Sequence, residues 1–294
     1  MCPRECGADR YSGRGICGEG AEMRISKIML HRFEEPCISG NQSYSTSNEN
    51  DARGSGAIFF SGCPLHCIYC QNNKISSGGK GDLFSPRQLA DEMLHLQEIG
   101  AYNINLVSPT HFTYQIIEAL DIAKPKLEIP VVFNTGGYEK AETVKRLEGY
   151  ADIFLTDFKY GSSETASKYS AAPNYVEVAA RSLKVMLEIT GTPVFDENGM
   201  MKKGVILRHL VLPGCRQDSV KALQTVANTV PSQSILLSLM SQYTPEFAPE
   251  NIKELRRRIT SFEYNFVLSE AEKLGFDGFS QAPSSATSAY TPEF

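Results

Sequence analysis

The feature that most limits the fold of this chain is the regular alternation of short apolar runs with longer segments of helical periodicity. Such runs, nearly free of polar residues, are typical of strands in parallel sheets that are covered on both faces. A closed barrel of eight strand–helix units needs roughly 250 residues. We therefore expect an α/β fold, a partial (β/α)6 barrel over residues 56–294, with strands at 57–60, 103–108, 129–135, 152–157, 205–212 and 234–240.

The segments between these runs predict the helices. Ser85 before Pro86 is an N-cap followed by proline at the first helical position. Leu89, Met93 and Leu96 follow at helical spacing. Residues 196–199 predict a hairpin-like excursion, and we expect further helices at 112–123, 140–149, 175–189, 219–229 and 249–274, the last with a break near Ser261.

Length and charge exclude several classes of protein. The chain has 294 residues, of which 41% are hydrophobic and 21% charged, enough for one large α/β domain or two small ones. Its net charge of −5 argues against binding to nucleic acid or to an anionic membrane. No run reaches the ~18 apolar residues of a membrane span, and the first residues lack the apolar core of a signal peptide. We therefore expect a cytoplasmic protein.

Three cysteines follow the first apolar run within one loop. This cysteine loop, residues 61–73, reads SGCPLHCIYCQNN and carries Cys63, Cys67 and Cys70. Three thiolates so close in sequence can surround one corner of a metal site and leave a fourth position open. A structural zinc site needs a fourth protein ligand, whereas an iron–sulfur cluster can leave one iron free, although most clusters have four cysteines. A zinc loop and unrelated buried thiols are the alternatives.

Polar side chains gather where the other apolar runs end. Because ligands bind at the carboxyl ends of the strands in a parallel barrel, the candidates are Ser108, Thr110, Asn134, Asp157, Lys159, Arg208 and His209. Asp157 and Lys159 are two residues apart, so a strand points both side chains to one face. Lys159 can offer a cation to a carboxylate. The alternative for this pair is an ordinary ion pair, which contributes little.

A cysteine-rich arm, residues 1–40, precedes the predicted barrel. It carries Cys2, Cys6 and Cys17 among several glycines, and Cys37 could supply a fourth thiolate. Four cysteines in a segment without a core of its own suggest a structural metal site, either zinc or a second cluster; free thiols are the alternative. Residues 41–55 are polar and predict a loop.

The spacing Cys63-x3-Cys67-x2-Cys70, with Tyr69 before the last cysteine, resembles the signature of the radical S-adenosylmethionine (SAM) superfamily. The resemblance implies that these cysteines hold a 4Fe–4S cluster whose open iron chelates SAM. It also implies reductive cleavage of SAM to a 5′-deoxyadenosyl radical, which abstracts hydrogen from a substrate. An electron donor such as flavodoxin or ferredoxin is implied as a partner.

The words CPRECG, at residues 2–7, and FDGFSQ, at residues 276–281, resemble more narrowly the uncharacterised branch related to pyruvate formate-lyase activating enzymes. This implies a glycyl radical enzyme as the substrate, and SAM binding by the Asp157-x-Lys159 word. Action on a small molecule or another macromolecule is the second hypothesis, and a zinc-stabilised binding protein without catalysis is the third. No residue is assigned as catalytic.

Two words depart from the activase pattern. Activases of this kind carry Gly-Gly-Glu, which binds the SAM amino group, where this chain has Ser108-Pro109-Thr110-His111. They also carry an aspartate where this chain has Asn134. The hydroxyls of Ser108 and Thr110 can accept from an ammonium group, but neither carries a charge.

Overall fold

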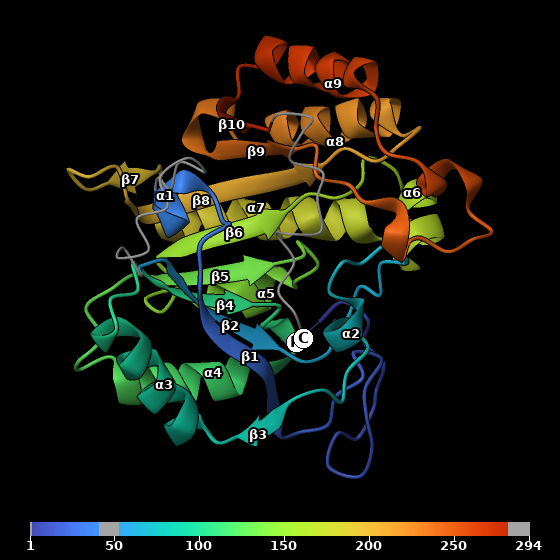
Figure 1. The fold of residues 1–294 in the computed structure, drawn as a ribbon. Helices are drawn as coiled ribbons and strands as arrows, with labels where there is room; N and C mark the ends of the chain where they lie inside the picture. Colours follow the sequence, from blue (N-terminus) through green and yellow to red (C-terminus); the bar gives the residue numbers. More distant parts are fainter. Residues whose placement is uncertain (1, 41–52, 282–294) are drawn as a thin grey trace.

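A computed structural model describes residues 2–40 and 53–281 of the chain (Figure 1). Within them, ten strands form one sheet in the order β10-β9-β8-β6-β5-β4-β2-β1-β3, with β7 paired to β8. Seven neighbouring strands of this sheet run parallel: β2 (Ser55–Phe60), β4 (Ile104–Val107), β5 (Val131–Thr135), β6 (Ile153–Asp157), β8 (Met201–Leu210), β9 (Leu236–Met240) and β10 (Asp277–Ser280). The first six of these confirm the six predicted strands.

Beyond β2 the sheet is extended by one strand of the arm and by a short edge strand that follows the cysteine loop. β1 (Met23–His31) pairs antiparallel with β2, with Ile28 opposite Ile58, and β3 (Asp82–Phe84) pairs antiparallel with β1. The expectation of an arm without a core is therefore wrong for its second half, because Met23 and Ile25 join the main core. The predicted polar loop at 41–55 lies mostly outside the described residues.

The predicted helices follow the strands, with two corrections: the helix expected at 140–149 ends at Lys145, where the chain goes into turns, and the helix expected from 249 begins later. In α3 (Pro86–Glu98) the Ser85 hydroxyl accepts from the Gln88 amide, which confirms the predicted N-cap. The other helices are α2 (Asn73–Ser76), α4 (Thr113–Ala123), α5 (Ala141–Lys145), α6 (Ser163–Ser170), α7 (Tyr175–Thr190), α8 (Arg216–Thr229) and α9 (Ser261–Lys273).

The helix predicted from residue 249 begins only at Ser261. Thr260 has extended backbone angles and forms a capping box with Glu263, so the helix cannot extend backwards through it. Residues 253–256 form a short 3-10 turn instead. The predicted excursion is confirmed: β7 (Val194–Phe195) pairs antiparallel with β8 around a turn in which Asp196 accepts from the Asn198 and Met200 amides.

The two faces of the sheet pack against different partners. Phe133 and Phe154 belong to the large core shared with the helices, whereas their neighbours Val132 and Leu155 pack against α1 (Pro36–Ser39). Figure 1 shows α1 on the face opposite α7. The segment that links β1 to α1 therefore reaches the inner face of the sheet. Among the described residues, no helix is long and apolar enough to cross a membrane.

Candidate functional site

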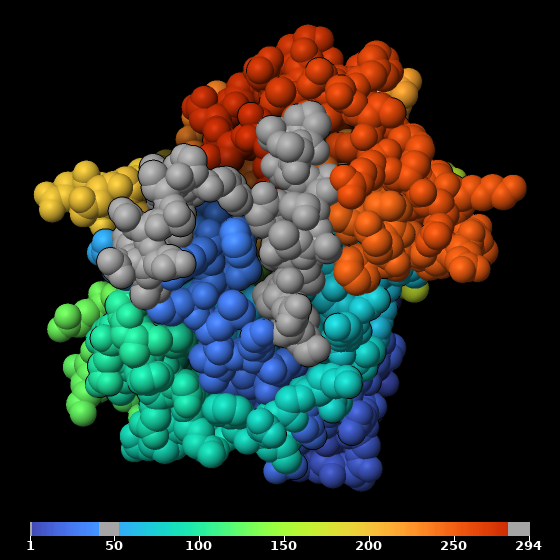
Figure 2. Space-filling view, in the orientation of Figure 1, coloured from blue at the N-terminus to red at the C-terminus, as the bar shows by residue number. Residues whose placement is uncertain are grey.

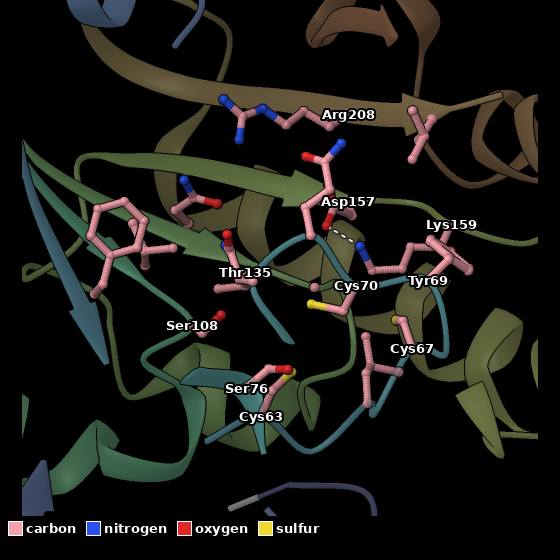
Figure 3. A pocket seen from close by; sticks show the side chains of 18 of the residues that line it. Cys63, Cys67, Tyr69, Cys70, Ser76, Ser108, Thr135, Asp157, Lys159 and Arg208 are labelled. Atoms are coloured by element: carbon pink, nitrogen blue, oxygen red, sulfur yellow. Dashed lines mark hydrogen bonds and ion pairs between the residues drawn. The ribbon is translucent and has the colours of Figure 1, made fainter. Parts of the chain in front are cut away.

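A cavity of about 260 Å³ lies at the carboxyl ends of the parallel strands (Figure 3). Three parts of the chain line it: the cysteine loop, the strand ends and the segment that follows β1. The lining residues include Cys63, Cys67, Cys70, Ser108, Asn134, Thr135, Asp157, Lys159, Arg208, Met240 and Gln242, together with His31, Phe33 and Glu34. The first half of the chain and the strand ends of the second half thus meet at one place.

All three cysteines of the cysteine loop face this cavity (Figure 3). Burial, reinforced by the neighbouring Cys67, raises the pKa of the Cys63 thiol to about 12. The same two causes raise the pKa of Cys70. A buried thiol stays neutral until a nearby cation compensates the charge of the thiolate, and a coordinated metal deprotonates it outright. The thiols are therefore suited to a metal centre and poorly suited to act as free nucleophiles.

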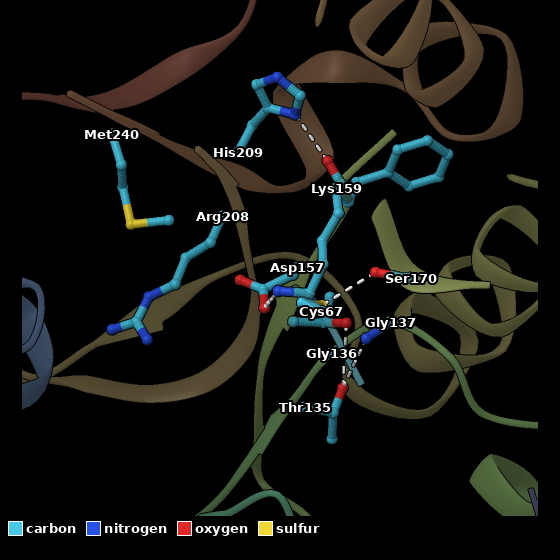
Figure 4. A network of polar contacts seen from close by, with 12 residues as sticks. Cys67, Thr135, Gly136, Gly137, Asp157, Lys159, Ser170, Arg208, His209 and Met240 are labelled. Carbon is cyan, nitrogen blue, oxygen red and sulfur yellow. Dashed lines mark hydrogen bonds and ion pairs between the residues drawn. The ribbon is translucent and has the colours of Figure 1, made fainter. Parts of the chain in front are cut away.

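A chain of hydroxyl groups lies behind Cys67. The Ser170 hydroxyl donates to Cys67 Sγ over 3.0 Å (Figure 4). It also pairs with the Tyr160 hydroxyl over 2.6 Å. Tyr160 in turn pairs with the hydroxyl of Tyr69 over 2.9 Å. Such contacts orient a ligand and tune the metal it binds. Sequence reasoning missed Ser170, because it lies at the end of α6, more than a hundred residues after Cys67.

Asp157 and Lys159 form an ion pair at the end of β6 (Figures 3 and 4). Each side chain is 21% exposed and faces the cavity. Burial alone would lower the pKa of Lys159, but the Asp157 carboxylate and Cys67 outweigh it, and the pKa lies well above its usual range. The lysine is therefore a permanent cation on the same cavity as the three thiols.

Ser108 and Asn134 line the cavity as predicted, and Thr110 does not. Ser108 has a φ of 58°, a left-handed conformation that is unusual for serine and costs on the order of 1–3 kcal/mol. Thr110 is buried and donates to Glu139 over 2.8 Å. The Thr110 prediction is corrected because this hydroxyl lies beneath the rim, where it satisfies a buried carboxyl group.

Glu139 is a buried carboxyl group that sequence reasoning overlooked. Burial raises its pKa to about 7, although hydrogen bonds from Thr110 and Thr135 act in the opposite direction. Thr135 lines the cavity and donates its hydroxyl to Glu139, so Glu139 holds this lining side chain in place.

Arg208 and His209 end on opposite faces of β8. Arg208 lines the cavity and forms ion pairs with Glu34 and, at 2.6 Å, with Glu35. His209 is buried away from the cavity, and its Nδ1 donates to the Phe158 carbonyl over 2.6 Å. The prediction is corrected for His209, since consecutive residues of a strand point to opposite faces.

The two glutamates were not predicted, because they follow the unpredicted strand β1. Glu34 lines the cavity and also accepts from Asn105 over 3.0 Å. The signal available in the sequence was the pair of acidic residues just before Pro36, which starts α1.

Cys37 lies apart from the other three cysteines of the arm. Cys6 and Cys17 both turn their sulfurs toward Gly15, where they would lie 3.5 and 3.4 Å from an added Cβ atom. Cys37 packs instead with Val132 and Ile153 on the inner face of the sheet. The prediction of Cys37 as a fourth ligand is therefore corrected, because α1 takes it into a separate apolar cluster.

Across residues 2–40 and 53–281, no three His, Cys, Asp or Glu side chains converge on the position of one metal ion. This is true of Cys2, Cys6 and Cys17, and equally of the cysteine loop.

Comparison with known proteins bears on this arrangement. Residues 57–202, which contain the cysteine loop and the ends of β4, β5 and β6, match the family model described as the Radical SAM superfamily. The chain belongs to the radical SAM superfamily. Its α/β fold with a mostly parallel sheet is consistent with the radical SAM partial barrel. A 4Fe–4S cluster and SAM are typical of this superfamily.

The radical SAM chain is also similar to individual proteins. It is 28% identical over 290 residues to the uncharacterised protein MJ0674 of Methanocaldococcus jannaschii, covering 94% of this chain and 75% of the relative. Among solved structures it resembles a radical SAM methyltransferase from Sphaerobacter thermophilus, with a TM-score of 0.53 and 12% identity over 77% of this chain and 66% of that one. At this identity the likeness concerns the fold alone.

A second solved structure, Streptococcus suis SuiB, is similar over 79% of this chain and 51% of its own length, with 12% identity and a TM-score of 0.47. The radical SAM chain thus spans about two thirds and about half of the lengths of these two proteins.

Proposed function

We propose that this radical SAM enzyme holds a 4Fe–4S cluster through Cys63, Cys67 and Cys70 and binds SAM in the cavity beside them. The observation that carries the proposal is the meeting of three partly buried thiols and the Asp157–Lys159 pair on one cavity. The hydroxyl of Ser170 already donates to Cys67, a contact that suits a thiolate ligand. When bound, the reduced cluster supplies the electron that cleaves SAM to methionine and a 5′-deoxyadenosyl radical.

The chain's own residues would bind and orient SAM. Lys159 donates to the SAM carboxylate, and Asp157 holds the lysine in place. Ser108 and Asn134 offer neutral hydrogen-bonding groups to the amino or ribose groups of SAM. Arg208 is already paired with two glutamates, so it would contact SAM without adding net positive charge.

Anaerobic reconstitution with iron and sulfide tests this proposal. The loaded protein should show the visible absorption of an iron–sulfur cluster and should form 5′-deoxyadenosine from SAM and dithionite. A variant with Cys63, Cys67 and Cys70 changed to alanine should lose both. Cys215→Ala is the matched control, since Cys215 contacts Tyr169 and does not line the cavity. 5′-Deoxyadenosine formation by the triple variant would overturn the assignment, and zinc in place of iron would favour the non-catalytic alternative.

For the substrate, we propose a glycyl radical enzyme, with flavodoxin or ferredoxin as the electron donor. The resemblance of CPRECG and FDGFSQ to the activase branch supports this choice. The loaded enzyme, mixed with a glycyl radical enzyme encoded beside it, should produce a glycyl radical signal in electron paramagnetic resonance. SAM cleavage without that signal would favour a small molecule or another macromolecule instead; the net charge of −5 disfavours nucleic acid.

A further inference from the structure

The start of the arm packs against the cysteine loop. Residues 2–20, here called the clamp segment, contain no helix or strand, and few of their side chains are buried. Figure 2 shows this segment, in dark blue, beside the cyan residues that follow the cysteine loop. We propose that the clamp segment holds the cysteine loop in the shape that receives the cluster, and that Arg4 is its main positioning residue. This inference rests on the proposed function.

Arg4 joins two parts of the site that are far apart in sequence. Its guanidinium donates to the carbonyls of Pro64, over 2.7 Å, and Leu65, over 3.1 Å, directly after Cys63. It also donates to the carbonyls of Ser170, over 2.7 Å, and Ala171. These two carbonyls lie at the end of α6, where the last helical carbonyls lack partners within the helix.

Ser170 takes part in two contacts. Its carbonyl accepts from Arg4, and its hydroxyl donates to Cys67 Sγ over 3.0 Å. One guanidinium therefore fixes the backbone after Cys63 and the residue that hydrogen-bonds Cys67. Its planar fork of five donors can serve several carbonyls at once, which the ammonium group of lysine does less well. The Arg4 guanidinium also lies 5.3 Å from the ring centre of Tyr138, which holds it in place.

Backbone contacts hold both ends of the cysteine loop. At its start, the Cys63 amide donates to the Cys17 carbonyl over 3.1 Å. Gly62 has a φ of 81°, and a Cβ atom there would lie 2.5 Å from that same carbonyl. Beyond its end, a Cβ atom on Gly18 would lie 2.3 Å from the Ser77 carbonyl. These approaches leave no room for a side chain, so the two segments pack backbone against backbone.

Two side-chain contacts, one from the clamp segment and one from the cysteine loop, add to these backbone contacts. Glu19 accepts from the Gly79 amide over 2.6 Å, and its own side chain is nearly buried. The His66 ring, inside the cysteine loop, pairs with the Ile16 carbonyl. The cysteine loop is thus held at its start, in its middle and just beyond its end by residues that precede it by about fifty positions.

Hydrogen exchange of the metal-free protein tests the clamp without requiring a cluster. Arg4→Gln should speed exchange of the amide hydrogens of residues 61–70 by at least about tenfold, the equivalent of one charge-assisted hydrogen bond. Arg87→Gln, an exposed arginine of α3, is the matched control and should leave these rates unchanged. Native rates in Arg4→Gln would overturn the proposal, whether or not the protein binds iron.

Glycine variants provide a second test in case Arg4→Gln does not fold. Gly18→Ala and Gly7→Ala each place alanine at a positive φ, but only the first meets another segment, since no atom lies within 4 Å of the added Cβ at Gly7. Faster exchange of residues 61–70 in Gly18→Ala alone supports the clamp. Equal exchange in both variants would mean that backbone strain, and not the contact with the loop, is responsible.

A readout of the loaded protein separates positioning from general stability. Arg4→Gln should release iron to a chelator about tenfold faster than Arg87→Gln, and its cluster should have a lower reduction potential, as a weakened Ser170 contact predicts. An unchanged potential and unchanged iron release would overturn the positioning role. A native protein that never holds a cluster would refute the proposed function, while the exchange data would still decide the clamp.

Discussion

Ser170 donates its hydroxyl hydrogen to Cys67 Sγ over 3.0 Å, although 103 positions separate the two residues. The bond draws electron density from the sulfur, so in a loaded cluster it stabilises the reduced state. We expect Ser170→Ala to lower the reduction potential of the cluster, measured by redox titration with electron paramagnetic resonance. Ser182→Ala, a buried serine of α7 that donates to Ala179, is the control. An unchanged potential in Ser170→Ala would contradict the assignment of Cys67 as a ligand.

Lys159→Met should weaken SAM binding and leave the cluster intact. One charge-assisted hydrogen bond is worth about 1.5–3 kcal/mol, so the dissociation constant should rise roughly ten- to a hundredfold. Methionine keeps much of the side-chain length, which limits the loss of packing. The measurement is a SAM titration of the reconstituted variant, followed by the resonance signal of the cluster.

The control for this variant is Lys145→Met, which removes an exposed lysine paired with Glu148. A purely structural Asp157–Lys159 pair predicts near-native affinity and a lower melting temperature. That result would remove Lys159 from the SAM site.

Glu139→Gln should flatten the dependence of stability on pH. The pKa of Glu139 is about 7 in the folded protein, above its usual 4.5, so the folded state holds more protons between these values. The contribution of Glu139 is therefore full below pH 4.5 and is lost as pH rises to about 7, by on the order of 3 kcal/mol. Denaturant unfolding across this window, with exposed Glu142→Gln as the control, measures the difference. Parallel pH profiles for native protein and Glu139→Gln would refute it.

Metal bound by the arm remains a prediction, now restricted to Cys2, Cys6 and Cys17. The variant with Cys63, Cys67 and Cys70 changed to alanine should retain about one zinc ion or a residual cluster, as one cysteine site would hold. Cys6→Ser should remove this metal, whereas Cys37→Ser should not, since Cys37 is buried against the sheet. Metal analysis after anaerobic loading tests whether these cysteines bind a metal. If the loaded triple variant contains no metal, the arm has no metal site.

Much of the scaffold could be predicted because its signals are local. The six predicted strands are short apolar runs, and the start of α3 is determined by the capping residues Ser85, Pro86 and Gln88. β1 was missed because its core contacts are few and its pairing partner lies about thirty residues later. The helix start at Ser261 was misjudged because the capping pair Thr260 and Glu263 was not recognised.

Within the site, the amino-acid sequence was sufficient for the residues whose position follows from one strand or one loop. Cys63, Cys67 and Cys70 share the cysteine loop. Asp157 ends β6 and Lys159 lies two residues beyond it, and the spacing of two predicted that both would face the same way. The alternation of side chains along a strand should likewise have separated Arg208 from His209. Long-range packing decided the rest: Glu34 and Glu35 reach Arg208, Ser170 reaches Cys67, and Arg4 reaches both the loop and α6. These contacts join segments 60 or more positions apart, and no periodicity or local propensity encodes which distant backbone a side chain will meet once the sheet has formed.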